Sequence, residues 1–168
     1  MNRIKLPKSV WAQAVLCLVL LMFWISSCSP AAVFSSTPFD TVCARVAEAA
    51  GSEYYPAMEA SRAKKYISLD DSDASQWAFY RTGDAYNAQE LLVAAFETDE
   101  QRDALEQKLT ERIRSQIQTY AGYAPAQEAM ATDALVDLEG NYALYYAGED
   151  ASAVQTAFQK ALQEGDGQ

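Results

Sequence analysis

An apolar run near the start of the chain is bounded by a basic segment on one side and a cysteine on the other. Residues 1–9 contain three basic side chains and no acidic one, and residues 10–25 are apolar except for Gln13. This order, followed by small residues, is typical of a secretory signal. The sequence Ile25-Ser26-Ser27-Cys28 has the form of a lipobox. We therefore expect cleavage before Cys28 and lipid on its thiol.

The apolar run also sets the expected location. About 16 residues are short for a membrane-spanning helix, which needs roughly 20. Two acyl chains on Cys28 would give stable anchoring. The prediction is a lipoprotein at the extracytoplasmic face of a cell membrane, and simple secretion or an uncleaved anchor are the alternatives. The predicted organisation is a signal peptide (1–27), a flexible tether (28–37), one domain (38–164) and a frayed tail (165–168).

Helical periodicity dominates the first part of the domain. Thr37-Pro38 is a typical helix start, the following apolar residues share one face, and Gly51 is a typical stop. The segment from Tyr54 to Ile67 predicts a second helix, entered through Pro56. Farther on, Thr98 can cap the longest helix, which carries an apolar residue every four positions from Leu105.

Strand patterns occur in two pairs. Residues 76–81 and 91–97 predict two strands around a polar loop, and residues 134–138 and 142–147 predict two more around Gly140-Asn141, which suits a type II′ turn. A final helix is expected from Asp150 to Leu162. The predicted fold is α+β: a small, largely antiparallel sheet packed by three to four helices in two layers.

The net charge of the chain disfavours some classes of binding partner. Removing residues 1–27 takes away three of 13 basic residues and none of 23 acidic ones, so the remaining 141 residues have a net charge of −13. Such a chain is unsuited to nucleic acid, whose binding needs clustered Lys and Arg. The chain has no histidine, the commonest general base and transition-metal ligand. We expect no cofactor and no metal.

The C-terminal half resembles a known family. The strand Glu90–Ala94 precedes the long charged helix, and then come Tyr123-Ala124-Pro125, the hairpin 138–144 and a helix containing Ala157-Phe158. This order resembles lipoproteins of clostridia and related Firmicutes that are built on a domain of unknown function (the DUF4358 type), over residues 40–162. The resemblance implies an extracytoplasmic lipoprotein of a Gram-positive anaerobe with no established activity.

Two short motifs could carry chemistry. Ser61 and Lys64 have the S-x-x-K spacing of penicillin-binding proteins, but the S-D-N and K-T-G elements are missing. Asp70, Asp71 and Asp73 crowd a turn, but their spacing fails the EF-hand pattern. An exposed helix face and a solvated acidic turn are the simpler interpretations.

Aromatic residues suggest a binding surface. Tyrosine suits half-buried strands, but aromatic platforms also stack on sugars and anchor protein partners. The candidate binding residues are Trp77, Tyr80, Tyr86, Tyr142, Tyr145 and Tyr146. The leading hypothesis is a domain without catalytic activity that contacts an envelope protein or glycan near the membrane. The alternative is a small hydrolase or transferase that uses Ser61 and Lys64 or a carboxylate pair.

Overall fold

Four strands form one antiparallel sheet within the residues that the computed structural model describes, 34–51, 57–82 and 86–165. Strand β1 (Gln76–Arg81) pairs with β2 (Glu90–Ala95), and β3 (Leu135–Glu139) pairs with β4 (Tyr142–Ala147). Strands β2 and β4 pair with each other, so the order is β1-β2-β4-β3. The two central strands are buried along their whole length.

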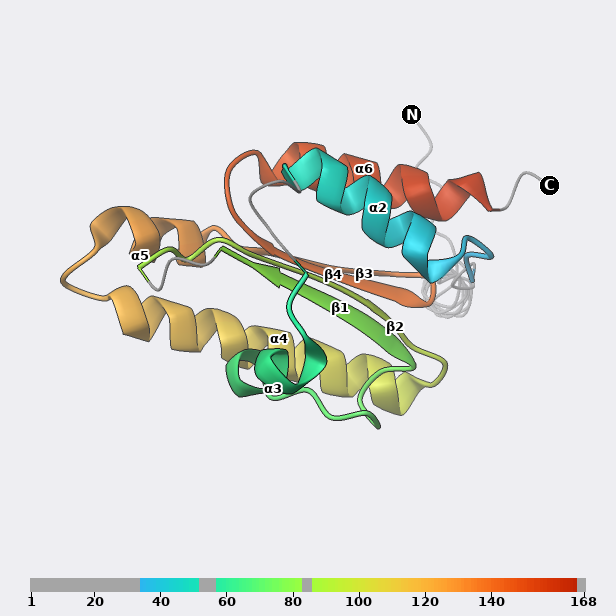
Figure 1. Cartoon of the computed structure of the whole chain (residues 1–168), viewed down its shortest axis with the longest axis horizontal. Helices are drawn as coiled ribbons and strands as arrows, with labels where there is room; N and C mark the ends of the chain where they lie inside the picture. Colours follow the sequence, from blue (N-terminus) through green and yellow to red (C-terminus); the bar gives the residue numbers. More distant parts are fainter. Residues whose placement is uncertain (1–33, 52–56, 83–85, 166–168) are drawn as a thin grey trace, which may run out of the picture. The chain divides into compact units, whose positions relative to one another are not determined.

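Helices cover both faces of this sheet (Figure 1). Helices α2 (Phe39–Ala50) and α6 (Ala151–Glu164) lie on one face, and α3 (Ala60–Ile67) and α4 (Asp99–Tyr120) lie on the other. Helix α5 (Pro125–Thr132) follows α4. The predicted α+β class is confirmed, but the two-layer arrangement is wrong because the sheet lies between two helical layers. The described residues form five helices, where three to four were expected.

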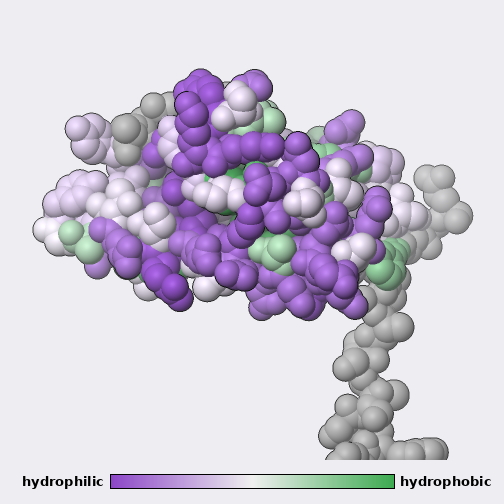
Figure 2. All heavy atoms as spheres, turned by 90° about the horizontal axis from the view of Figure 1, so that it is seen from below, coloured by the Kyte–Doolittle hydropathy of each residue, from purple (hydrophilic) through white to green (hydrophobic). Residues whose placement is uncertain are grey.

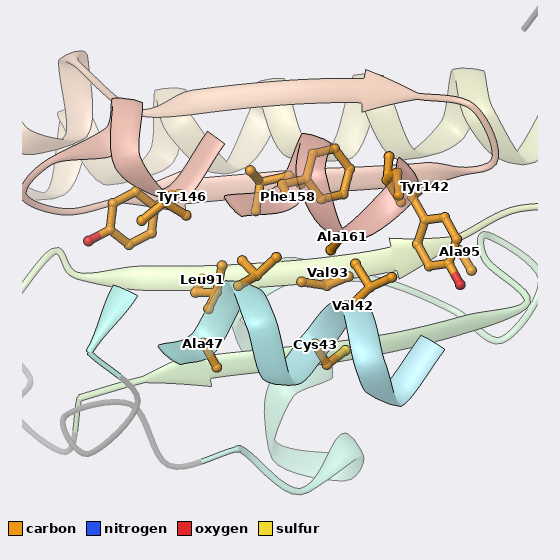
Figure 3. Packing of buried hydrophobic residues seen from close by; sticks show 14 residues of the cluster. Val42, Cys43, Ala47, Leu91, Val93, Ala95, Tyr142, Tyr146, Phe158 and Ala161 are labelled. Atoms are coloured by element: carbon orange, nitrogen blue, oxygen red, sulfur yellow. The ribbon is translucent and has the colours of Figure 1, made fainter. Parts of the chain in front are cut away.

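Alternate side chains of the two central strands, β2 and β4, pack into two separate hydrophobic cores. Leu91 and Val93 of β2 join Leu144 of β4 and the apolar sides of α2 and α6 in the α2/α6 core. Figure 3 shows Val42 and Cys43 of α2, and Phe158 of α6, pointing toward this face. The intervening residues belong to the α3/α4 core, on the other face of the sheet. Because a strand turns successive side chains to opposite faces, strands between two cores are apolar at nearly every position.

A capping residue and a turn glycine fix the start of α4 and the β3–β4 turn, as the sequence predicts. The Thr98 side chain accepts a hydrogen bond from the Gln101 backbone N–H at 3.2 Å, and the Gln101 side chain accepts one from Glu97 N–H at 2.8 Å. This capping starts α4. Gly140 has a φ of 59° in the two-residue turn between β3 and β4, a conformation that glycine adopts without steric cost.

Other predicted boundaries change. The predicted helix from Tyr54 to Ile67 begins only at Ala60, because Met58 N–H donates to Phe79 O at 2.8 Å and Ala57 forms an antiparallel bridge with β1. Residues 54–56 lie outside the described residues, as do the predicted signal peptide, tether residues 28–33 and tail residues 166–168. Among the residues described, no helix is long and apolar enough to cross a membrane.

The tether prediction is wrong for its last residues. Ser35 and Thr37 are buried, and Ser36 donates a hydrogen bond to the Gly165 carbonyl at 2.6 Å. A chain that is buried and hydrogen-bonded belongs to the domain rather than to a linker. The ordered domain therefore begins before residue 38.

Candidate functional site

A buried carboxylate lies where β1, β2 and α4 meet. Glu90 begins β2, its side chain has no exposed surface, and its strand partner is Arg81 of β1. Arg81 Nε donates to Oε1 of Glu90 at 3.0 Å. Arg112 of α4 donates from Nε to Oε2 at 2.8 Å and from Nη2 to Oε1. The two guanidinium groups thus bind both oxygens of one carboxylate, and we call these three residues the Glu90 centre.

Tyrosines surround the Glu90 centre. The Tyr145 hydroxyl donates to Oε2 of Glu90 at 3.4 Å, and burial raises the pKa of this phenol. The Tyr66 ring lies 4.8 Å from the guanidinium carbon of Arg81 and 5.9 Å from that of Arg112. Tyr120 is also buried, and burial raises the pKa of its phenol while the positive charge of Arg81 opposes this shift. Cation–π contacts of this kind favour a positive charge at a site with little water.

The pKa of Arg112 shows how the centre balances its charges. Burial opposes the charged guanidinium, but the hydrogen bonds and charge of Glu90 outweigh it and raise the pKa of Arg112. Arg112 is therefore charged at every physiological pH. The guanidinium groups of Arg81 and Arg112 thus face the single negative charge of Glu90. The Arg81 side chain is 10% exposed and the Arg112 side chain is 12% exposed, so water has little access to these charges.

The geometry limits the chemistry of Glu90. A carboxylate has about four lone-pair sites, and four protein donors from Arg81, Arg112 and Tyr145 occupy them. Glu90 is therefore saturated and unsuited to act as a general base. Among the described residues, the buried Nε2 atom of Gln116 has no hydrogen-bond partner.

Sequence reasoning missed the Glu90 centre. One signal was present: Arg81 ends the first predicted strand, Glu90 directly precedes the second, and the two side chains have opposite charges. In an antiparallel pair such residues meet. Nothing in the sequence indicated that Arg112, from a helix 22 residues later, completes the pair.

The predicted aromatic surface is not present as one surface. Tyr142, Tyr145 and Tyr146 are 4%, 0% and 2% exposed, so the prediction is wrong for these three residues. Tyr142 and Tyr146 belong to the α2/α6 core (Figure 3), and Tyr145 belongs to the α3/α4 core. They are buried because helices cover both faces of the sheet.

The remaining candidate aromatics are dispersed. Trp77 and Tyr80 are half-buried beside opposite cores, and Tyr86 is 75% exposed in the β1–β2 connection. The predicted polar loop 84–87 lies partly outside the described residues. Figure 2 shows that the surface over α3 and α4 is mostly hydrophilic.

Ser61 and Lys64 have separate partners. The Ser61 hydroxyl donates to the Glu59 carboxylate, and Lys64 Nζ donates to Asp71 at 2.8 Å. The hydrogen bond to Asp71 raises the pKa of Lys64. A lysine that activates a serine needs the opposite shift, because it must be neutral to accept a proton.

The acidic turn is neutralised by lysines. Asp73 accepts from Lys108 Nζ at 2.6 Å and from Asp70 N–H at 2.6 Å, while Asp71 binds Lys64. In the part of the chain that the structure covers, no three His, Cys, Asp or Glu residues are grouped as metal ligands.

A small hollow of about 210 Å³ lies between α3 and α4, next to the Glu90 centre. Tyr66, Lys108 and Arg112 line it together with Ser68, Glu111 and Ser115. Its two cationic groups are already engaged, Lys108 by Asp73 and Arg112 by Glu90. The hollow therefore offers little uncompensated charge to a ligand.

Cys43 is buried in the α2/α6 core. The pKa of its thiol is raised to about 12, mainly by burial; a hydrogen bond with Tyr80 partly opposes this shift, and the charge of Asp40 supports it. Because the thiolate is the reactive form, Cys43 is a structural residue.

Taken together, these features define a class: a small α+β domain whose sheet is covered on both faces and whose buried polar centre is saturated by its own side chains. A family model described as "Domain of unknown function (DUF4358)" matches residues 51–148. The chain belongs to this family, as the resemblance predicted. No curated protein and no solved structure matches the chain. The matched segment runs from before α3 to the end of β4 and includes the complete Glu90 centre.

Proposed function

We propose that the chain is a lipoprotein, held by acyl chains on Cys28 at the extracytoplasmic face of a cell membrane, and that its domain works by binding rather than by catalysis. The observation that carries the proposal is the order of the first 28 residues: basic residues, a short apolar run, two serines and a cysteine. This order suits export, cleavage and lipidation together.

The proposed cleavage would keep the part of the chain that forms the described cores. Among the described residues, the buried members of the α2/α6 core and the α3/α4 core lie between Val42 and Leu162, after Cys28.

A protein or glycan of the cell envelope is the proposed partner. The net charge of −13 without residues 1–27 disfavours nucleic acid and adsorption to anionic lipids. The resemblance to clostridial and related Firmicute lipoproteins favours a Gram-positive source. A partner reached from a short tether must lie close to the membrane.

The alternative, an enzyme that uses Ser61 and Lys64 or a carboxylate pair, receives less support. Ser61 binds Glu59, Lys64 binds Asp71, and the buried carboxylate of Glu90 is fully occupied. None of these side chains has the free acceptor that a general base requires.

The substitution Cys28→Ala tests the anchor. We expect loss of incorporated radiolabelled palmitate and either release of the protein from the membrane fraction or accumulation of the uncleaved form. Cys43→Ala is the matched control and should keep label and membrane association. Unchanged labelling and retention in Cys28→Ala would refute the lipoprotein assignment.

Crosslinking in cells tests the binding role. A photoreactive residue at exposed Tyr123 should capture a reproducible protein or glycan partner, and the same residue at buried Tyr145 should not. Failure to recover any partner above background from several exposed positions would contradict the binding role.

A further inference from the structure

The first residues of the domain are fastened to one end of it. Ser35 N–H donates to the Asn141 side chain at 2.8 Å, and the Ser35 hydroxyl donates to Leu162 O at 2.6 Å. The Thr37 hydroxyl donates to Ala161 O at 2.8 Å. Ser35 and Thr37 are 8% and 4% exposed. These bonds fix where the polypeptide enters the domain.

This entry point lies at the end of the domain that carries the β3–β4 turn. Asn141 accepts the hydrogen bond from Ser35 and, through its carbonyl, one from Phe96 N–H at 2.9 Å, just before α4. The C-terminus of α6 lies at the same end (Figure 1). We call this end, with residues 35–37 and 140–141, the anchor end.

The opposite end carries the turn between α4 and α5, residues 121–124 (Figure 1). We call it the far end. Helix α4 has 22 residues and runs between the two ends, so they are separated by about 33 Å.

Six residues, 29–34, separate Cys28 from Ser35. A chain of this length spans at most about 24 Å from Cys28 to Ser35. We propose that the domain is held with its anchor end facing the lipid surface and its far end directed away from it. This inference rests on the proposed lipidation of Cys28.

Charge favours this upright arrangement. The chain without residues 1–27 has a net charge of −13, and an anionic bilayer repels such a domain over about one Debye length, roughly 8 Å. Attachment at one end keeps that end near the lipid, while repulsion drives the rest outward. Tyr123, which is 58% exposed, is then presented away from the membrane at the far end.

Energy transfer to the bilayer tests the arrangement. The mature lipidated protein, in vesicles of equal parts phosphatidylglycerol and phosphatidylcholine, carries a donor dye on a single introduced cysteine and the lipid carries a headgroup acceptor. The two labelling sites are Gln163→Cys at the anchor end and Ala121→Cys at the far end, both exposed positions. Cys43 is buried and stays unlabelled.

We expect transfer from position 163 to be at least about twofold more efficient than from position 121, because their heights differ by roughly the length of α4. Inserting twelve Gly and Ser residues after Ser29 should lower the transfer from position 163. Equal transfer from the two positions, or greater transfer from 121, would overturn the proposed orientation while leaving lipidation intact. Protein that lacks lipid and does not bind the vesicles would instead overturn the proposed function, and the orientation with it.

Discussion

Glu90 illustrates how a single charged residue can be buried. An isolated carboxylate in an apolar core is costly, and the cost is offset only when hydrogen bonds and opposite charges replace water. Glu90 meets this requirement with four donors from three side chains. The centre connects β1, β2 and α4, and Tyr145 adds β4, so these contacts align elements that are far apart in the sequence.

The substitution Glu90→Gln should destabilise the fold by about 3 kcal/mol, because it leaves two buried guanidinium groups without a negative partner. Urea unfolding monitored by circular dichroism measures the change. Glu111→Gln is the control, since Glu111 is exposed on α4, next to Arg112, and accepts a hydrogen bond from Gln107; its effect should be below about 0.5 kcal/mol. A loss of less than about 1 kcal/mol for Glu90→Gln would contradict the importance of the centre.

The raised pKa values of Cys43 and Tyr80 predict that the fold loses stability at alkaline pH. Burial raises the pKa of the Cys43 thiol from 9.0 to about 12, and burial followed by the neighbouring Cys43 raises the pKa of Tyr80 from 10.0 to about 12. Between these values the unfolded chain loses protons that the folded chain keeps. The free energy of unfolding should therefore fall as pH rises from about 9 to 12.

Urea unfolding at several values across this range measures the slope. Cys43→Ala should reduce it, whereas Ser152→Ala, at an exposed position of α6, should not. A slope that is unchanged in Cys43→Ala would show that the thiol does not titrate as its burial predicts.

Helices, strands and caps that depend on neighbouring residues could be predicted from the sequence. Segments whose conformation depends on distant partners could not. Strand 76–81, strand 142–147 and the Thr98 cap were predicted from local patterns, because each depends on residues adjacent in sequence. The helix predicted from Tyr54 failed because residues 57–58 bond to β1 instead. The tether prediction failed at residues 35–37 because their partners lie more than 100 residues away.

Thr37→Val tests the contact between the entry segment and α6. Valine keeps the shape of threonine but loses the hydroxyl that donates to Ala161 O, so we expect a loss of about 1–2 kcal/mol and faster amide exchange in the last turn of α6. Thr156→Val is the control, because the Thr156 hydroxyl is exposed and donates within its own helix. Equal effects of the two substitutions would show that the entry segment contributes nothing to α6.

For the whole molecule, the composition of the central strands was the signal for a third layer. Strands β2 and β4 read ELLVAA and YALYYA, with almost no polar alternation. A sheet with one face in water alternates, and a sheet covered on both faces does not. The prediction of an exposed aromatic surface is wrong for the tyrosines of β4, which lie on both sides of the strand and are buried because both sides are covered.

The family match covers only part of this three-layer structure. Residues 51–148 contain the whole sheet with α3, α4 and α5, but α2 and α6 lie outside. These two helices pack against each other and together cover one face of the sheet. Without them, the residues of β2 and β4 that face the α2/α6 core, such as Leu91, Val93 and Leu144, would be exposed.

We therefore expect a chain of residues 51–148 to lack a cooperative fold and a chain of residues 34–165 to have one. Five large apolar residues of α2 and α6 are missing from the shorter chain: Val42, Val46, Val154, Phe158 and Leu162. At about 2 kcal/mol each, their burial contributes roughly 10 kcal/mol, which is comparable to the total stability of a small domain. Thermal unfolding by circular dichroism, with binding of a hydrophobic dye at room temperature, measures the difference. Sharp unfolding of the 51–148 chain without dye binding would show that the sheet is stable with one face uncovered.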